Sequence, residues 1–138
     1  MKKKHKTTLN FYKNLGNLFY AIAAADKSIT PLEVITLKEI IKSKWLKTET
    51  LKDTFGTDSA YQIEFIFDIL HRENNLDVEK CYADFINYKK AQNHFFSPSV
   101  NQLILQTANA IANSFSGKNK SELILLAKLE MELRKTDI

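Results

Sequence analysis

The stretch AIAAADKSITPLE, residues 21–33, predicts the end of one helix, a short loop and the start of the next helix. Its small residues let another backbone approach the end of the first helix closely. Thr30 is expected to cap the second helix, with Pro31 at its first position and Glu33 at its third, which is the capping-box pattern. The stretch therefore predicts a tight helical hairpin. It also contains the first two acidic residues of the chain, Asp26 and Glu33.

Apolar residues recur at helical spacing along almost the whole chain, and no convincing alternation typical of a strand interrupts them. Residues 47–58 break this spacing and are expected to connect two helices. We therefore predict an all-α fold, a compact bundle of about six helices. The first two helices are expected over about 8–25 and 31–46, and the third over a stretch that includes Ile63 and Leu70. The fourth is expected to follow a cap at Asp77, the fifth to begin at Ser97 and Pro98, and the sixth to run from about residue 120 onwards.

The composition suits one folded domain in a reducing compartment. Hydrophobic residues make up 44% and charged residues 26% of the 138 residues, which is typical of a compact helical protein rather than a disordered chain. The single cysteine, Cys81, falls on an apolar stripe and is expected to be buried. The basic start lacks the features of a secretory signal, and residues 95–117 contain too many amides for a membrane span. We therefore expect a cytoplasmic protein.

Positive charge is concentrated at the start of the chain. The net charge is +4, and five lysines precede the first acid, Asp26, so the rest of the chain carries a net charge of −1. We expect residues 1–7 to form a basic flexible tail and residues 8–138 to form the single domain. No aromatic residues interleave with a basic stripe, so contact of the tail with nucleic acid or an anionic membrane is only a secondary expectation.

The hairpin pattern recurs once along the chain. A shift of 89 residues superimposes the Ala-Ile-Ala triplet at 21–23 on the same triplet at 110–112, and Glu33 on Glu122. In both places the triplet falls in the last turn of one expected helix, and the glutamate falls in the first turn of the next. We therefore predict two helical hairpins that form a degenerate internal repeat.

These residues resemble the tellurite-resistance TerB-like domain family over about residues 8–135. The resemblance implies an all-helical module of bacterial stress and membrane-linked responses, with acidic positions that bind divalent cations. Lys27 stands where the family usually has Gly, and Phe115 stands where the second copy should have Asp. The resemblance rests on Ala25, Asp26, Ile29 and Glu33, with Ala110, Ile111, Ala112 and Glu122 as the second copy.

The acidic residues allow two interpretations. Asp26 and Glu33 have the spacing of positions 5 and 12 of a calcium-binding loop, but Ile22 and Ala24 would occupy ligand positions, so the full loop is excluded. A smaller divalent-cation site would consist of Asp26, Glu33 and Glu122. In the other interpretation Glu33 and Glu122 are helix-capping residues and Asp26 stabilises the turn.

Two other groups of residues are expected to be structural. Glu64, Asp68 and His71 share one helix face, which we interpret as a solvated face rather than a metal centre, because a di-iron bundle needs more glutamates and a second histidine. The phenylalanines are expected to pack in the core. This second group comprises Phe65, Phe67, Phe85, Phe95, Phe96 and Phe115.

The function expected from the sequence is non-enzymatic. No phosphate loop, serine-nucleophile motif or dinucleotide fingerprint occurs in the chain. We predict a module for protein interaction or scaffolding, and the resemblance adds a bacterial stress response as its setting. The alternative is a divalent-cation sensor or buffer built on Asp26, Glu33 and Glu122. No resident cofactor is expected other than that cation, and the oligomeric state is left open.

Overall fold

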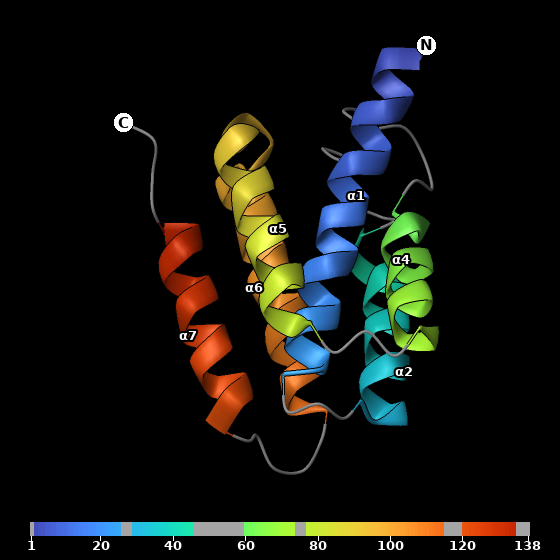
Figure 1. Cartoon of the computed structure of the whole chain (residues 1–138), viewed down its shortest axis with the longest axis vertical. Helices are drawn as coiled ribbons and strands as arrows, with labels where there is room; N and C mark the ends of the chain where they lie inside the picture. Colours follow the sequence, from blue (N-terminus) through green and yellow to red (C-terminus); the bar gives the residue numbers. More distant parts are fainter. Residues whose placement is uncertain (1, 26–28, 46–59, 74–76, 115–119, 135–138) are drawn as a thin grey trace.

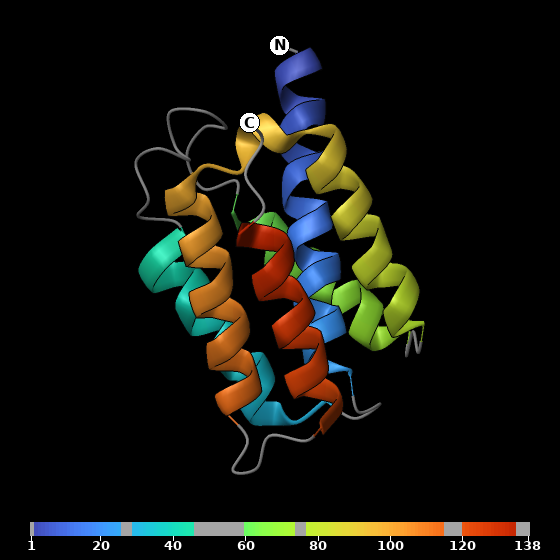
Figure 2. The same ribbon diagram turned by 90° about the vertical axis from the view of Figure 1, so that its left-hand side faces the viewer.

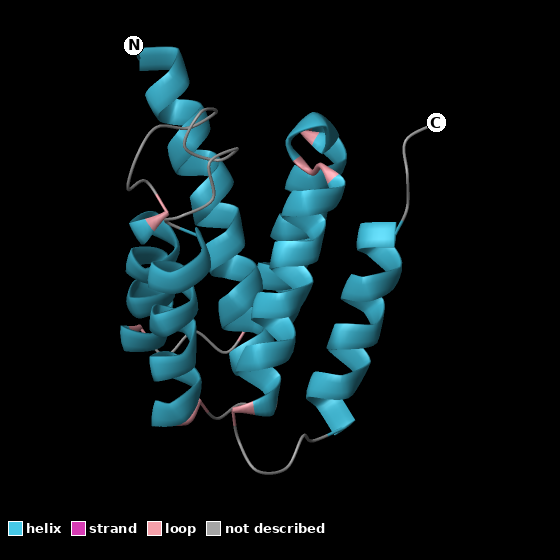
Figure 3. Cartoon of the chain, turned by 180° about the vertical axis from the view of Figure 1, so that it is seen from behind, coloured by secondary structure: helices cyan, strands magenta, loops and turns pink. Residues whose placement is uncertain are grey.

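A computed structural model describes residues 2–25, 29–45, 60–73, 77–114 and 120–134. These parts of the chain are helical and contain no strand, so the predicted all-α bundle is confirmed (Figure 1, Figure 3). Two short irregular helices accompany the α-helices: the π-helix η1 (Ile41–Trp45) and the 3-10 helix η2 (Asn93–Phe95). The α-helices are α1 (Lys2–Ala23), α2 (Pro31–Ile40), α4 (Tyr61–Arg72), α5 (Val78–Ala91), α6 (Pro98–Asn113) and α7 (Lys120–Arg134).

Helix α1 is the central element of the bundle. It packs most extensively against α4 and α5, and it also contacts α6 and α7 (Figure 1). Every residue from 15 to 24 is buried, so this part of the helix is surrounded by protein on all sides. A helix that is buried all round is apolar all round. The sequence LGNLFYAIAA meets this condition, because Asn17 and the hydroxyl of Tyr20 are its only polar side-chain groups.

Helix α1 begins earlier than expected. It starts at Lys2 rather than near residue 8, so it includes six of the seven residues expected to form the tail. Lysine is a good helix former, and no Gly or Pro precedes residue 8 to stop the helix from extending. The 22 residues span about 33 Å at the usual helical rise. The N-terminal end consequently projects beyond the neighbouring helices (Figure 1).

The predicted start of α2 is confirmed. Thr30 is its N-cap, and the Thr30 hydroxyl accepts a hydrogen bond from the Glu33 amide at 3.2 Å. In return, Glu33 Oε1 accepts from the Thr30 amide at 2.8 Å and from the Thr30 hydroxyl at 3.1 Å. The helix was expected to continue to about 46 as one α-helix. Instead, its last turn is the π-helix η1, which ends at Trp45.

A buried polar contact joins η1 to α6. Trp45 Nε1 donates a hydrogen bond of 2.9 Å to Thr107 Oγ1, and that hydroxyl donates one of 2.8 Å to the Leu103 carbonyl. Trp45 and Thr107 are both buried. A buried donor needs an acceptor within the protein, and Thr107 Oγ1 supplies one for the indole N–H.

A cluster of aromatic rings closes the corner between α5 and α6. Phe96 follows η2, and its ring lies 5.7 Å from that of Phe11 and 5.8 Å from that of Phe85, measured between centroids. Lys89 is buried beside this cluster, with Nζ 5.9 Å from the centre of the Phe96 ring and 3.4 Å from Asn93 Oδ1. The ring face and the amide oxygen both stabilise the buried ammonium group.

One of the phenylalanine predictions is wrong. Phe67, Phe85 and Phe96 are buried, and Phe95 is partly buried against the core. Phe65 is 59% exposed, because it lies two positions from the inward residues Ile63 and Phe67 and so points to the opposite side of α4. Phe115 lies outside the described residues.

The two aligned segments occupy equivalent positions in the helices. Residues 21–23 end α1 and residues 110–112 lie in the last turn of α6. Glu33 and Glu122 are each the third residue of the following helix, α2 and α7 respectively. The internal repeat itself stays a prediction. Among the described residues, no helix combines the length and the apolar character needed to cross a bilayer.

Replacing Gly16 with alanine is expected to destabilise the protein by about 1–3 kcal/mol, as overpacking does in a close-packed core. A Cβ atom at Gly16 would lie 2.7 Å from Ile66 Cβ and 3.1 Å from the Ile63 carbonyl oxygen. In an unconstrained helix the same change stabilises by roughly 0.5–1 kcal/mol, so the sign of the effect is diagnostic. Urea unfolding measures it, and a Gly16→Ala variant as stable as the native chain would contradict the close approach of α1 and α4.

Replacing Thr107 with valine is expected to cost about 1–3 kcal/mol, because Trp45 Nε1 would stay buried without its acceptor. The Trp45→Phe, Thr107→Val double variant removes both partners. A double-mutant cycle of unfolding free energies should therefore show coupling between the two positions. Strict additivity of the two single losses would argue against this bond.

Candidate functional site

Of the three residues of the predicted cation site, only Glu33 has a side chain that the structure describes. Glu33 is almost fully buried, and its Oε1 atom accepts both hydrogen bonds from Thr30. Glu122 lies in the first turn of α7, but its side chain is outside the described residues, as is Asp26 altogether. The described residues contain no group of three or more Cys, His, Asp or Glu side chains arranged to hold a metal ion. The observed role of Glu33 is therefore helix capping.

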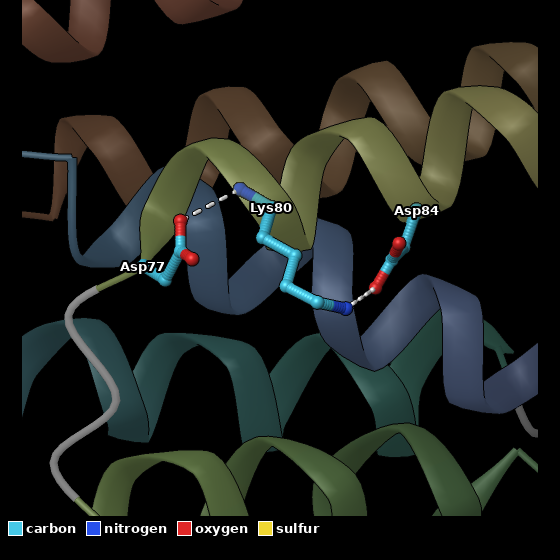
Figure 4. Close-up of polar contacts among 3 residues, drawn as sticks. All are labelled: Asp77, Lys80 and Asp84. Carbon is cyan, nitrogen blue, oxygen red and sulfur yellow. Dashed lines mark hydrogen bonds and ion pairs between the residues drawn. The ribbon is translucent and has the colours of Figure 1, made fainter.

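Cys81 is buried near the start of α5, as predicted. The cap residue Asp77 accepts a hydrogen bond of 3.1 Å from the Lys80 amide, and Lys80 Nζ contacts Asp84 Oδ2 at 3.0 Å (Figure 4). Burial, followed by the charges of Asp84 and Asp77, raises the pKa of the Cys81 thiol. Burial and a raised pKa both disfavour the nucleophilic thiolate, as is typical of a cysteine that packs in a core.

The outward side of α4 carries an unusual row of residues. Tyr61, Phe65, Asp68 and Arg72 follow one another at helical spacing along it. Tyr61 is 43% exposed and Phe65 is 59% exposed. The opposite side of the helix supplies Ile63 and Phe67 to the core, so α4 presents large apolar side chains on both sides.

A groove of about 410 Å³ lies between α2 and the C-terminal half of α4. Lys38 of α2 lines it together with Asp68, His71 and Arg72 of α4. Lys38 Nζ lies 3.6 Å from Asp68 Oδ2, which forms an ion pair between the two helices. Both side chains are well exposed, so the pair contributes at most about 1 kcal/mol.

A second hollow of about 330 Å³ adjoins the groove and shares Asp68 with it. Tyr61 and Phe65 form its apolar part, and Gln62 and Glu64 complete its lining. Glu64 Oε1 is shielded from solvent and accepts no hydrogen bond from the described residues. Together the two hollows define a surface with Tyr61 and Phe65 near the start of α4 and Asp68, His71 and Arg72 nearer its end. We call this surface the α2–α4 face.

The sequence predicted only part of the α2–α4 face. Glu64, Asp68 and His71 do lie on one side of α4, as their spacing indicated. The contribution of Lys38 was missed, because nothing local links α2 to α4. Phe65 was assigned to the core, although its two-residue offset from Phe67 was the signal that placed it outside.

Two variants of Glu33 separate capping from cation binding. Replacing Glu33 with alanine removes the capping box and should cost about 1–2 kcal/mol of stability. Glu33→Gln keeps an acceptor for the Thr30 amide but removes the negative charge, so its loss should be smaller. Thermal unfolding in chelator and then in excess calcium, magnesium, manganese or zinc measures both. A metal that stabilises the native chain and not Glu33→Gln would show that Glu33 binds a cation as well as capping α2.

Comparisons with known proteins do not place this chain in a family. It matches no protein-family model, no curated protein and no solved structure. The resemblance to TerB-like domains therefore stays a prediction that rests on the two aligned segments.

Proposed function

We propose that the protein is a non-enzymatic interaction module that binds a segment of another protein on the α2–α4 face. The observation that carries this proposal is the exposure of two aromatic side chains, Tyr61 and Phe65, at the edge of a groove with charged walls. Aromatic residues are enriched in protein interfaces, and a few anchor residues, tyrosine among the commonest, carry most of the binding energy.

The charges on this face favour a protein partner over a polyanion. Lys38 and Arg72 are cationic, whereas Glu64 and Asp68 are anionic, so both signs alternate over a short distance. The two carboxylates offset the two cations, so the face offers a nucleic acid or an anionic membrane no net positive charge. A peptide segment with apolar side chains, a basic group and an acidic group matches the face.

Each part of the face has a role in that interaction. The apolar side chains of the segment would cover Phe65 and Tyr61 and remove them from water. A basic group of the segment would be attracted by the carboxylates of Glu64 and Asp68. An acidic group would pair with Arg72, for which the described residues provide no ion pair.

The TerB-like resemblance adds a setting to this proposal. It suggests that the module acts in a bacterial stress response, and it supplies no partner. The alternative function, cation sensing through Asp26, Glu33 and Glu122, is tested separately by the Glu33 variants above.

A peptide-display selection tests the proposal. Random peptides are selected on the immobilised native chain and are then measured against a Phe65→Ser variant. Because Phe65 is already exposed, its replacement should leave the fold intact. The affinity of the selected peptides should fall at least about tenfold, which is the effect of losing a contact worth roughly 1.4 kcal/mol.

Leu123→Ser on α7 is the matched control. Leu123 is exposed to a similar degree but lies on another helix, so the same peptides should bind this variant as they bind the native chain. Failure to recover any peptide that depends on Phe65 would overturn the proposal. An equal loss of peptide affinity in Phe65→Ser and Leu123→Ser would overturn it as well.

A further inference from the structure

Lys89 is a buried cation that no carboxylate accompanies among the described residues. It is 3% exposed, and its Nζ atom has one acceptor, Asn93 Oδ1 at 3.4 Å, beside the face of the Phe96 ring. An ammonium group has three N–H donors, and a buried charge is usually paired with an opposite charge. The ion pairs of the described residues do not include Lys89. Negative charge is therefore missing at the corner between α5 and η2.

The helices that meet at this corner carry lysines and no acidic residue. Residues 1–25 and 85–113 contain neither aspartate nor glutamate. The described parts of these segments form α1, the second half of α5, η2 and α6. Lys13, Lys90 and His94 are exposed. The lysines in these segments are Lys2, Lys3, Lys4, Lys6, Lys13, Lys89 and Lys90.

Ring contacts place η2 against α1. The Phe95 ring lies 6.1 Å from the Phe11 ring, and η2 lies at the same end of the bundle as the start of α1 (Figure 1, Figure 2). The lysines at positions 2, 3, 4 and 6 precede Phe11 by five to nine residues, which is about 8–14 Å along the helix. This distance is comparable to the Debye length of about 10 Å at 0.1 M salt, so the fields of the two groups add. We call Lys2, Lys3, Lys4, Lys6, Lys89 and Lys90 the basic end.

The start of α1 has the opposite charge from the one that stabilises a helix. Its first turn contains Lys2, Lys3 and Lys4 and no acid. The free amides at a helix start already form the positive end of the helix dipole, so cations there are unfavourable. Lys2 and Lys6 are also four residues apart, the spacing at which like charges on a helix repel. Bound anions would relieve both effects.

We propose that the basic end binds the phosphate backbone of double-stranded nucleic acid, independently of base sequence. The phosphates would pair with Lys90 and with the lysines of α1. They would also offset the charge of Lys89 without touching it, because salt screens a buried charge less than an exposed one. The basic end shares no residue with the α2–α4 face, so this binding does not depend on the proposed peptide site.

The residues around the basic end favour a duplex over a membrane or a single strand. The sequence KKKHKTT at 2–8 contains no apolar residue, whereas a helix that lies on a membrane inserts an apolar side. Single strands stack their bases on exposed aromatic rings, but Phe11 and Phe96 are buried and Phe95 is partly buried. A duplex backbone requires only positive charge.

Fluorescence anisotropy of a short labelled DNA duplex, titrated with the full chain at several salt concentrations, tests the proposal. The logarithm of the affinity should fall linearly with the logarithm of the salt concentration, with a slope of about −0.9 for each phosphate neutralised. Replacing both Lys3 and Lys4 with glutamine should make this slope shallower by about 2, and Lys90→Gln should make it shallower by about 1. Glutamine is a good helix former, so these variants should keep the native circular dichroism spectrum.

Two further variants test the position of the site. Lys120→Gln combined with Lys128→Gln removes two exposed charges from α7 and is the matched control, which should bind the duplex like the native chain. Lys89→Met removes the buried charge and keeps an apolar side chain of similar length. It should weaken the duplex at low salt at least about twofold, the effect of one charge acting over roughly 10 Å in water.

The outcomes that overturn the proposal are specific. A chain that binds no duplex even at low salt overturns it, and so does a slope that changes equally in the Lys3 and Lys4 variant and in the α7 control. Native affinity in both Lys89→Met and Lys90→Gln would remove the corner between α5 and η2 from the site. Vesicles of phosphatidylserine and phosphatidylcholine are titrated in parallel, and binding to them without binding to the duplex would overturn the proposal in favour of a membrane.

Discussion

The complete burial of the C-terminal half of α1 is the constraint on which the rest of the structure depends. Residues 15–24 are excluded from water on every side, so the other helices must surround them. The absent side chain of Gly16 allows α4 to approach until Ile66 leaves no room for a Cβ atom. Close packing of this kind fixes the position of α4, and the groove beside α4 follows from it.

The arrangement around α1 also determines which side chains remain outside. Helix α4 packs mainly on α1, and helix α7 packs on α6 and α1, so each of them buries one apolar side and leaves the other exposed. Phe65 on α4 and Met131 on α7 are consequences of this geometry. Both exposed sides carry charged residues close to the apolar ones, which is the combination found in interfaces between proteins.

In the hairpin between α1 and α2, the sequence position of Glu33 fits both a cation ligand and a helix cap. Glu33 has the position expected of a cation ligand and of a capping residue, and the observed hydrogen bonds to Thr30 are those of a cap. Capping supplies a partner for amides at a helix start that have none within the helix. A glutamate three residues after a threonine is therefore explained by the local backbone before any ligand is considered.

Local signals in the sequence determined the helices, their caps at Thr30, Asp77 and Ser97, and most of the core, because these features depend on residues only a few positions apart. The sequence also placed Glu64, Asp68 and His71 on one side of α4. Only the tertiary structure decided that Lys38 of α2 meets Asp68 and that Trp45 donates to Thr107. These contacts join distant parts of the chain, and helical periodicity contains no information on which helix will pack against which.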